Sequence, residues 1–505
     1  MSFLKVSGTK IVDEQGNEVI LRGAGLGGWM NMENFITGFP GCEFQIREAL
    51  AETIGEEKSE FFFDKFLEYF FEDADAVFFK SLGLNCIRLP FNYRHFEGKD
   101  AGVNRFYYYF NTNRSNIIDD MNPRVLKEAG FKHLDRVIDI CAKHGIYTIL
   151  DLHTAPGGQN TDWHSDHGGH IANFWNHKDF QDRVVWLWSE LAKHYKSHAW
   201  IAGYNPLNEP TDATHTRLLA FYHSVYGAIR AADPAHAIFF DGNTFASDFS
   251  RFGDACARWA NTAYAIHDYS PYGFPVVPGK EGREELYSGT EEQRRRMRRS
   301  YERKREWMDQ RGLCVWNGEW GPVYARKQFE GEDADAINTV RYKVLQDQLE
   351  IYNKDRLSWS IWLYKDIGFQ GMVHVAPSTP YISLFSSFLQ KKHALAVDAW
   401  GASTASIAHI YDPLVAHIKE HVPEAYRNLY PHPVWKLEDR VGRLSRNILV
   451  SEYLVREWAE KFTGLGEEEL DALARSFRFD ACVKREELNE ILRRNAQVAA
   501  AAAAQ

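Results

Sequence analysis

Residues 127–153, KEAGFKHLDRVIDICAKHGIYTILDLH, decide the fold class. The first part has the apolar spacing of an amphipathic helix, and IYTILDLH (146–153) is a short apolar run that ends in polar residues. A similar run, CIRLP, lies upstream at 86–90. Strands buried on both faces are continuously apolar, which is typical of parallel sheets. The stretch therefore predicts a strand, a crossover helix and a parallel strand.

Eight such apolar runs occur along the chain with helical stretches between them. They are VILRGAG (19–25), CIRLP, IYTILDLH, IAGYNPLNEP (201–210), AIFFDG (237–242), AYAIHDY (263–269), LCVWNGEW (313–320) and LSWSIWLYKD (357–366). An open doubly wound sheet is the competing architecture, but GAGLGG (23–28) matches no phosphate-binding fingerprint. Polar residues instead cluster where many of the strands end, and a barrel brings all those ends to one face. The sequence predicts a (β/α)8 barrel.

The regions outside these runs suggest how the chain is divided. Residues 4–24 predict a small hairpin, with a turn at 13–17, followed by the first strand. The barrel is expected to occupy residues 1–428, and 429–505 to form a helical extension. The segments EEELDALARSF (467–477) and REELNEILRRN (485–495) have helical patterns, and the alanine-rich tail is expected to be frayed.

Composition narrows the function classes. The chain has 69 acidic and 59 basic residues, so its net charge of −10 disfavours nucleic acid as a partner. The basic run EEQRRRMRRSYERKREW (291–307) is interpreted as the solvated face of a long helix. No uninterrupted apolar stretch of about 18 residues predicts a membrane span. The N-terminus lacks a signal-peptide pattern, so a cytoplasmic location is expected, although a mature secreted form would look the same.

Cysteine and tryptophan usage adds two expectations. The six cysteines include no CxxC pair, and Cys86 and Cys314 lie in strand-like runs. Isolated buried thiols are expected, with neither a zinc site nor a disulfide framework. The 15 tryptophans suit a carbohydrate site, because flat apolar rings with a polar edge pack on sugars.

Two glutamates are candidates for chemistry. Glu209 lies in Asn208-Glu209-Pro210 after the fourth run, and Glu319 lies in Trp316-Asn317-Gly318-Glu319-Trp320-Gly321 at the end of the seventh. Cleaving a glycosidic bond with retention requires two carboxyl groups about 5–5.5 Å apart, one protonated and one ionised. A glutamate before proline is also common as a simple helix cap, but two such residues at barrel strand ends favour catalysis. Glu209 suits the acid/base role and Glu319 the nucleophile.

These motifs resemble glycoside hydrolase family 5, over roughly the first 400 residues, and within it the fungal exo-β-1,3-glucanase and β-glucosidase branch. The resemblance implies a retaining enzyme. No metal or organic cofactor is expected, because the two carboxyl groups suffice for the chemistry and no cluster of ligand residues competes with them. The resemblance implies that Glu33, which follows RGAGLGGW (22–29), binds the far hydroxyls of the terminal glucose. It places Arg88 under the nucleophile and Asn208 on the sugar 2-hydroxyl.

The resemblance also assigns residues on the other strands. His153 is expected to donate a hydrogen bond in the sugar subsite, His267 and Tyr269 match the pair on the sixth strand, and Tyr269 is expected to contact the nucleophile. Trp362 resembles the platform under the glucose ring. A lone histidine in an apolar strand, or one of many tryptophans, is more often a core residue, so these roles rest on the resemblance.

One departure from the branch concerns specificity. Thr161-Asp162-Trp163-His164 replaces the branch's Gly-Phe-Asp-Asn, and an aromatic or sterol aglycone or a disaccharide unit is then an option. ENFITGFPGCEF (33–44) and YYYF (107–110) could narrow the pocket mouth. The leading hypothesis is release of a terminal β-linked glucosyl unit, with transglycosylation as a side reaction. The alternatives are a diglycosidase, a glycolipid or steryl β-glucosidase, and a non-catalytic sugar-binding barrel. The oligomeric state stays open.

Overall fold

A computed structural model describes residues 3–98, 124–276, 284–398, 400, 403–427 and 436–503. Eight parallel strands close into a barrel in chain order, with the last strand paired to the first. They are β3 (Arg22–Gly25), β4 (Cys86–Asn92), β5 (Tyr147–Thr154), β6 (Ile201–Asn205), β7 (Ala237–Asp241), β8 (Thr262–His267), β9 (Cys314–Glu319) and β10 (Ser358–Ile361). Each coincides with one of the eight apolar runs, so the predicted (β/α)8 fold is confirmed.

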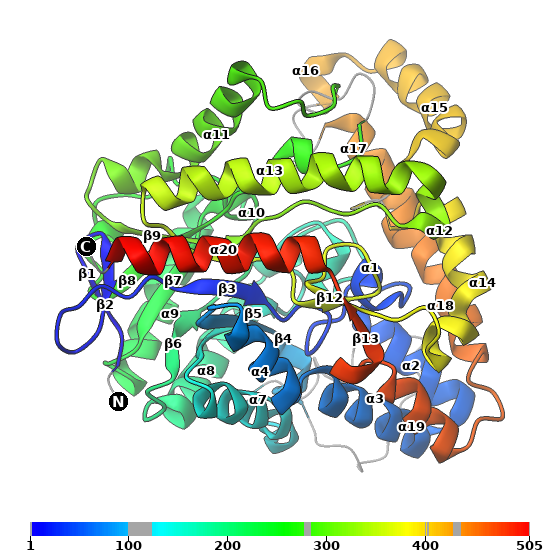
Figure 1. Ribbon diagram of the computed structural model, residues 1–505, viewed down its shortest axis with the longest axis horizontal. Coiled ribbons are helices and arrows are strands. Elements are labelled where there is room, and N and C mark those ends of the chain that lie inside the picture. The colour runs from blue at the N-terminus through cyan, green and yellow to red at the C-terminus, as the bar shows by residue number, and fades with distance from the viewer. Residues whose placement is uncertain are drawn as a thin grey trace.

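Helices surround the strands and cover their outer faces (Figure 1). Those before β10 are α1 (Asn34–Thr37), α2 (Glu43–Ile54), α3 (Glu56–Phe70), α4 (Asp73–Ser81), α7 (Phe131–Lys143), α8 (Lys178–Tyr195), α9 (Thr216–Ala232), α10 (Asn243–Ala246), α11 (Glu291–Asp309), α12 (Lys327–Glu330) and α13 (Ala334–Lys354). The later ones are α14 (Pro380–Ala394), α15 (Ala408–His421), α16 (Glu424–Arg427), α17 (Leu437–Gly442), a π-helical stretch Arg443–Val450, α18 (Ser451–Glu460), α19 (Glu467–Arg475) and α20 (Glu486–Ala503).

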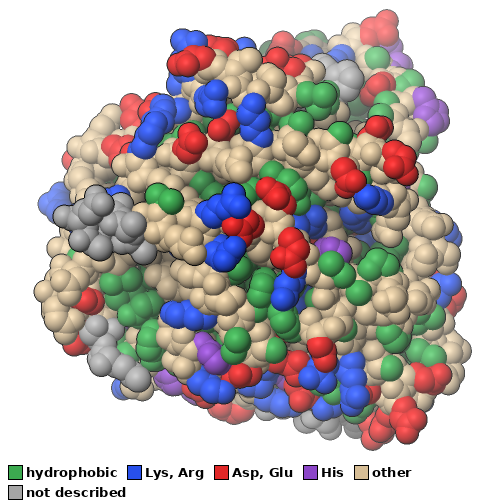
Figure 2. All heavy atoms as spheres, viewed as in Figure 1, with side chains coloured by type: hydrophobic (Ala, Val, Ile, Leu, Met, Phe, Trp, Pro, Cys, Tyr) green, Lys and Arg blue, Asp and Glu red, His purple; other side chains and the backbone are tan. Residues whose placement is uncertain are grey.

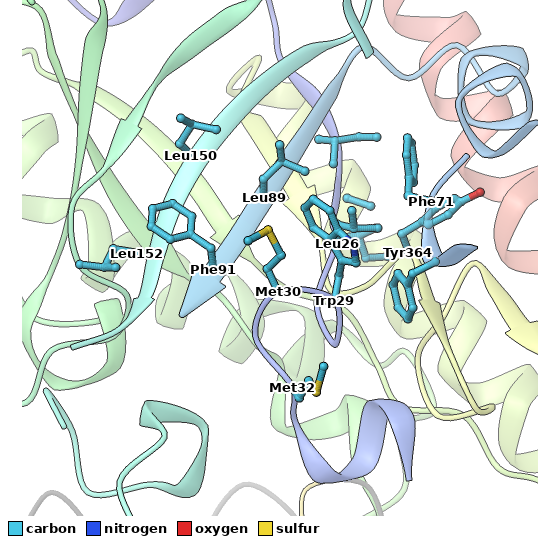
Figure 3. Close-up of a cluster of buried hydrophobic side chains, with 14 of the residues drawn as sticks. Leu26, Trp29, Met30, Met32, Phe71, Leu89, Phe91, Leu150, Leu152 and Tyr364 are labelled. Atoms are coloured by element: carbon cyan, nitrogen blue, oxygen red, sulfur yellow. The ribbon is translucent and has the colours of Figure 1, made fainter. Parts of the chain in front are cut away.

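Alternation along the strands separates the core from the site. On β4 and β5, Leu89, Phe91, Leu150 and Leu152 are fully buried and join the large apolar cluster that includes the helices, as Figure 3 shows. Neighbours in a strand point to opposite sides. Arg88 therefore points into the barrel, which is where the polar side chains of these strands meet.

The amino-terminal end of the barrel is closed by an apolar plug. Leu4, Ile11 and Leu21 pack there with side chains from inside the barrel, including Phe239 and Trp316. The hairpin that carries the first two consists of β1 (Lys5–Ser7) and β2 (Lys10–Val12). It closes at Gly8, which has a φ of +58°, and the turn predicted at 13–17 forms directly after it. The turn at 13–17 also joins antiparallel segments, because Val12 bridges Glu18 and the N–H of Val19 donates to the carbonyl of Ile11, so the predicted hairpin is present and the turn at Gly8 is an addition to it.

The carboxy-terminal segment packs on the barrel. Trp458 lies against Phe39, and Phe477 against Phe66, with ring centroids 5.0 and 4.8 Å apart. Strand β13 (Cys482–Lys484) pairs with β12 (Val373–Val375), which also pairs with β11 (Lys365–Asp366). Helix α20 lies along α13 in Figure 1 and continues to Ala503. The helix thus includes alanines of the tail, in keeping with the high helix propensity of alanine, and fraying of the tail stays a prediction.

The structure agrees with two further expectations, one about the basic run at 291–307 and one about the cysteines. Helix α11 exposes its arginines, and three of them pair with Glu292, so the basic run is the solvated helix face that was predicted. Acidic and basic side chains are interspersed over the face shown in Figure 2. All six cysteines are free, and five of them are buried. Within the described ranges, no helix combines the length and apolarity that crossing a bilayer requires.

Candidate active site

Glu209 and Glu319 meet at the carboxyl ends of the strands. Glu319 is the last residue of β9, and Glu209 follows β6 by four residues. One carboxylate oxygen of each lies within 4.8 Å of the other, and the Nδ1 atom of His267 lies within the same distance of both. Both carboxylates are largely buried, with side-chain exposures of 12% for Glu209 and 6% for Glu319. The separation is that of a carboxyl pair acting on one bond.

Glu319 is surrounded by donors. Arg88, which is fully buried, contacts Oε1 of Glu319 with its guanidinium, and the hydroxyl of Tyr269 donates to Oε2 at 2.9 Å. The resemblance predicts both contacts. The same guanidinium donates to Oδ1 of Asn208 at 2.6 Å and lies 3.1 Å from Asp151. A cation and a phenol therefore both contact the Glu319 carboxylate.

Glu209 has a different setting. Its φ of +46° places it in the left-handed region, which is uncommon for a residue with a side chain. The backbone amide donates to Oδ2 of Asp241 at 2.9 Å, which helps to hold this conformation. Two imidazoles reach its carboxyl group: His267 Nδ1 lies 2.7 Å from Oε1, and His164 Nε2 lies 3.1 Å from Oε2. Glu209 thus lies between two histidines and has no direct contact with Arg88 among the described interactions.

The pKa values around Glu209 depend on these imidazoles. Burial raises the pKa of Glu209, but hydrogen bonds from His164 and His267 outweigh it when both rings donate, and its pKa then lies well below the ordinary range. Burial lowers the pKa of both histidines, and the neighbouring carboxylates outweigh it and raise them. Where the proton resides in this group therefore depends on which ring nitrogens carry hydrogen.

A second cluster lies beside the pair. His153 Nδ1 is 2.7 Å from Asp151, its Nε2 is 3.5 Å from Oε1 of Glu33, and the amide of Asn208 lies 3.3 Å from Nε2. Burial lowers the pKa of His153, but the charges of Asp151 and Glu33 outweigh it and raise it to about 10. Among the described atoms, Oε1 of Glu33 is buried and has no hydrogen-bond partner. A buried carboxylate oxygen without a donor is suited to accept a sugar hydroxyl.

Trp362 lies next to this cluster, directly after β10, and its indole packs against Gly25 and Gly27. A Cβ atom on Gly25 or on Gly27 would lie 2.5 Å from the indole. Trp362 stacks with His153 at an interplanar angle of 3° and is 3% exposed. The GAGLGG stretch therefore has a steric purpose: only glycine leaves room for the ring. Trp400 continues the aromatic wall, because its ring packs edge-on to Tyr269 at 5.1 Å.

In the segment that departs from the fungal branch, the rings of Trp163 and His164 lie in different places. Trp163 is 4% exposed and packs with Trp362 and Phe35, so as placed it does not offer its ring to an aglycone at the mouth. His164 lies inside the site on Glu209. Residues 33–44 form α1 and the start of α2 next to the pocket, whereas YYYF (107–110) lies outside the described residues.

All nine predicted site residues lie at this end of the barrel, and the structure adds others. Asp241 ends β7 as Glu319 ends β9, so the same strand-end rule identifies it. Asp151 lies two positions before His153 on β5, which puts both on one face. Burial raises the pKa of Asp241 to about 6. Asn160 and His164 follow no strand, and no sequence pattern marks their contact with Glu209.

Two groups in the described part of the chain bring three potential metal ligands together. One is Glu209, His267 and Glu319; the other is the exposed set His417, Glu420 and His421 on α15. In the first group, the Arg88 guanidinium already contacts Glu319, and a divalent cation there would face that positive charge. The donor set suits an acid and a nucleophile better than a metal.

A closed (β/α)8 barrel with two facing carboxyl groups at its carboxyl end defines a glycoside hydrolase. The family model "Cellulase (glycosyl hydrolase family 5)" matches residues 57–368, and the chain belongs to this family. It is 70% identical to "Beta-xylosidase" of Phanerodontia chrysosporium, over 99% of both chains. It is 27% identical to "Glucan 1,3-beta-glucosidase" of Pichia angusta, over 43% of this chain and 47% of that one.

The endoglucanase Cel5A of Thermotoga maritima superposes with a TM-score of 0.46 and 17% identity, over 70% of this chain and 91% of that chain. An endogalactoceramidase superposes with a TM-score of 0.49 and 15% identity, over 72% and 75%.

Proposed function

We propose that the protein is a retaining β-glycosidase that removes one terminal sugar by double displacement. The observation that carries this proposal is the approach of the Glu209 and Glu319 carboxylates to within 4.8 Å. Glu319 attacks the anomeric carbon while Glu209 protonates the leaving oxygen, which forms a glycosyl–enzyme ester. Glu209 then removes a proton from water, the hydroxide oxygen attacks the anomeric carbon, and Glu319 leaves as a carboxylate.

The different surroundings of the two carboxylates support this division of labour. Arg88 and Tyr269 stabilise negative charge on Glu319, which the attacking group needs. Glu209 has no cationic guanidinium among its described contacts and can hold or release a proton through its imidazole neighbours. Exchanging the roles would require the guanidinium-bound carboxylate to hold the proton. We therefore assign Glu319 as nucleophile and Glu209 as acid/base.

The remaining side chains form the proposed sugar subsite. Glu33 supplies a buried carboxylate 3.5 Å from His153, His153 supplies an imidazole, and Asn208 supplies an amide beside the two carboxylates. Trp362, which stacks on His153 beside them, is proposed as an apolar wall of this subsite. Charge-assisted hydrogen bonds to sugar hydroxyls give both orientation and affinity.

Among sugars, we propose a β-xylosyl unit as the one released, because the chain is 70% identical over nearly its whole length to a protein named "Beta-xylosidase". A glucosyl unit, which the sequence analysis favoured, is the second candidate and is supported by the more distant glucan 1,3-β-glucosidase. Xylopyranosides and glucopyranosides share their hydroxyls at C2, C3 and C4. They differ only in the hydroxymethyl group at C5, so the proposed subsite residues can serve both.

The test compares 4-nitrophenyl β-xyloside with 4-nitrophenyl β-glucoside on the full chain. We expect kcat/KM for the xyloside to be higher by about tenfold or more, the size of effect that one carbon-sized group has in a closed pocket. A preference for the glucoside would favour the second candidate. A 2-deoxy-2-fluoro β-xyloside with a dinitrophenyl leaving group should label Glu319 covalently, and peptide mapping would locate the added mass. An unlabelled chain that hydrolyses xyloside would contradict the retaining mechanism.

A further inference from the structure

The side-chain amide of Asn160 has one possible orientation. Its Oδ1 lies 3.0 Å from the backbone N–H of Asp162, and its Nδ2 lies 3.1 Å from the backbone carbonyl of Glu209. A backbone N–H can only donate and a carbonyl oxygen can only accept. Turning the amide over would place its nitrogen, a donor, against the N–H of Asp162 and its oxygen, an acceptor, against the carbonyl of Glu209. These two backbone groups therefore determine which end of the amide is nitrogen.

This orientation determines what His164 can do. Nδ2 of Asn160 also lies 2.9 Å from Nε2 of His164, with its second hydrogen available for that contact. An N–H that points at a ring nitrogen requires a lone pair there. Nε2 of His164 is therefore an acceptor, and the neutral ring carries its hydrogen on Nδ1.

Oε2 of Glu209 lies 3.1 Å from the same Nε2. An ionised oxygen would face a lone pair at that distance and be repelled, whereas a protonated oxygen can donate its hydrogen to the ring. An imidazolium would instead point its Nε2 hydrogen at the amide hydrogens of Asn160. A protonated Glu209 beside a neutral His164 avoids both conflicts, because the Glu209 hydroxyl and the Asn160 amide then share the one lone pair of Nε2 in a three-centre contact.

The other carboxylates that raise the pKa of His164 are each in contact with a partner of their own. Glu33 and Asp162 are the further carboxylates that act on His164, and Glu33 faces the cationic His153 while Asp162 contacts Arg443 from the carboxy-terminal segment. His267 approaches the other oxygen of Glu209 with Nδ1 and lies 3.7 Å from Asp241. Glu319 lies 3.6 Å from His267 and is itself held by Arg88. The negative charges near His164 thus have cations of their own.

We propose that His164, kept as an acceptor by Asn160, holds the acid proton on the Glu209 carboxyl group in the free enzyme and is therefore a positioning residue for the acid catalyst. This inference rests on the proposed function of Glu209. When a glycoside enters, its bridging oxygen replaces Nε2 as acceptor and receives the proton as the glycosidic bond breaks. In the second step the proton that Glu209 takes from water returns to the same contact with Nε2, so the cycle is balanced.

The test uses the pH dependence of kcat/KM and the leaving group together. The basic limb of the profile reports ionisation of the acid in the free enzyme. A hydrogen bond to the protonated form favours that form, so its loss in His164→Ala should move the basic limb to lower pH by about half to one unit. The ratio of kcat/KM for a dinitrophenyl glycoside to that for a methylphenyl glycoside should rise about tenfold, because only the poorer leaving group needs a proton.

His164→Gln is the matched control. Its amide oxygen can accept from both Asn160 and Glu209, so the basic limb and the leaving-group ratio should return toward those of the unmodified chain. A basic limb that rises in His164→Ala would mean that the ring donates to an ionised Glu209 and would overturn the inference. An unchanged limb together with an unchanged ratio would show a purely structural role and would also overturn it. Covalent labelling of Glu319 in the unmodified chain separates these results from failure of the proposed function itself.

Discussion

The two ends of the barrel use the same strands in opposite ways. At the amino-terminal end, alternate residues such as Ile149, Phe239 and Trp316 form a closed apolar plug. At the carboxyl end, Asp151 and His153 lie two and four residues beyond Ile149 on β5 and are just as deeply buried. The first end excludes polar groups, and the second concentrates them.

The two ends of the barrel therefore contribute differently to the stability of the fold. Burying a charge is unfavourable unless it is paired and hydrogen-bonded, and the described contacts give Arg88, Asp151 and Glu319 such partners. The plug requires no pairing, because apolar burial is favourable in itself. We expect changes at the carboxyl end to alter chemistry, and changes at the plug to alter stability.

The largest effect is expected for Glu319→Ala. Removing the proposed nucleophile should lower kcat on an aryl β-glycoside by on the order of 10⁵-fold. The fold should survive, since Arg88 keeps Asp151 at 3.1 Å and Asn208 at 2.6 Å. Steady-state kinetics with circular dichroism would check both parts. Loss of the folded state instead of the activity alone would show that the carboxyl end also carries the stability of the barrel.

Glu209→Ala should follow, with a loss of about 10²–10⁴-fold on substrates with poor leaving groups. Azide should restore much of the rate on an activated substrate, because the anion can enter the vacated space and attack the glycosyl–enzyme without a base. The product would be a β-glycosyl azide, identifiable by its NMR coupling constant. An α-azide would contradict double displacement at this site.

Phe239→Ala tests the plug. Phe239 is fully buried on β7, its ring packs edge-on to Trp316 at 5.1 Å, and Gly203 on the next strand leaves room for it. The cavity should lower the free energy of unfolding by about 3–5 kcal/mol, with kcat changed by less than about twofold. Urea unfolding and kinetics would measure the two quantities. Phe239→Leu, which removes fewer atoms, should be destabilised less. If Phe239→Ala instead loses activity while its free energy of unfolding is unchanged, the distinction between the two ends of the barrel is wrong.

The smallest expected effect is a loss of stability at acidic pH, when Glu43 becomes protonated. Burial raises the pKa of Glu43, but His95 and Arg47 outweigh it and lower the pKa to about 2. A carboxyl whose pKa is depressed by folding adds stability above its unfolded pKa, and that stability is lost as the pH falls from about 4.5 toward 2. The chain should therefore lose about 1–3 kcal/mol more over this interval than Glu43→Gln does. Chemical unfolding at pH 6 and pH 3 would measure the difference, and equal losses would rule out this residue as the source.

Much of the site was predictable because a barrel converts sequence position into location. A polar residue that ends a parallel strand must lie at the carboxyl face, so His153 and Glu319 could be grouped before any coordinates were known. Arg88 lies within β4 and reaches the same site from inside the barrel. Asp241 obeys the same rule. Its place at the end of AIFFDG was sufficient to predict it, although the sequence analysis did not select it.

Other features depended on contacts between distant segments. Asn160 and His164 reach Glu209 from a loop whose path no periodicity describes, and Trp163 is buried where a mouth residue was expected. The carboxy-terminal helices share an apolar cluster with α2 and α3 through Trp458 and Phe477. A helical pattern shows which face is apolar, but it does not identify the surface that will cover that face.

By itself, the sequence determined the class of fold and the pair of carboxylates, since strand periodicity and strand ends are local properties of the chain. Only the tertiary structure decided which groups surround each carboxylate: a guanidinium and a phenol for Glu319, two imidazoles for Glu209. Proton affinity depends on neighbours a few ångströms away, and those neighbours come from three separate parts of the chain: β4, the loop that carries His164, and residues 267–269. That is why the identity of the candidate acid could be predicted, while the means of keeping its proton could not.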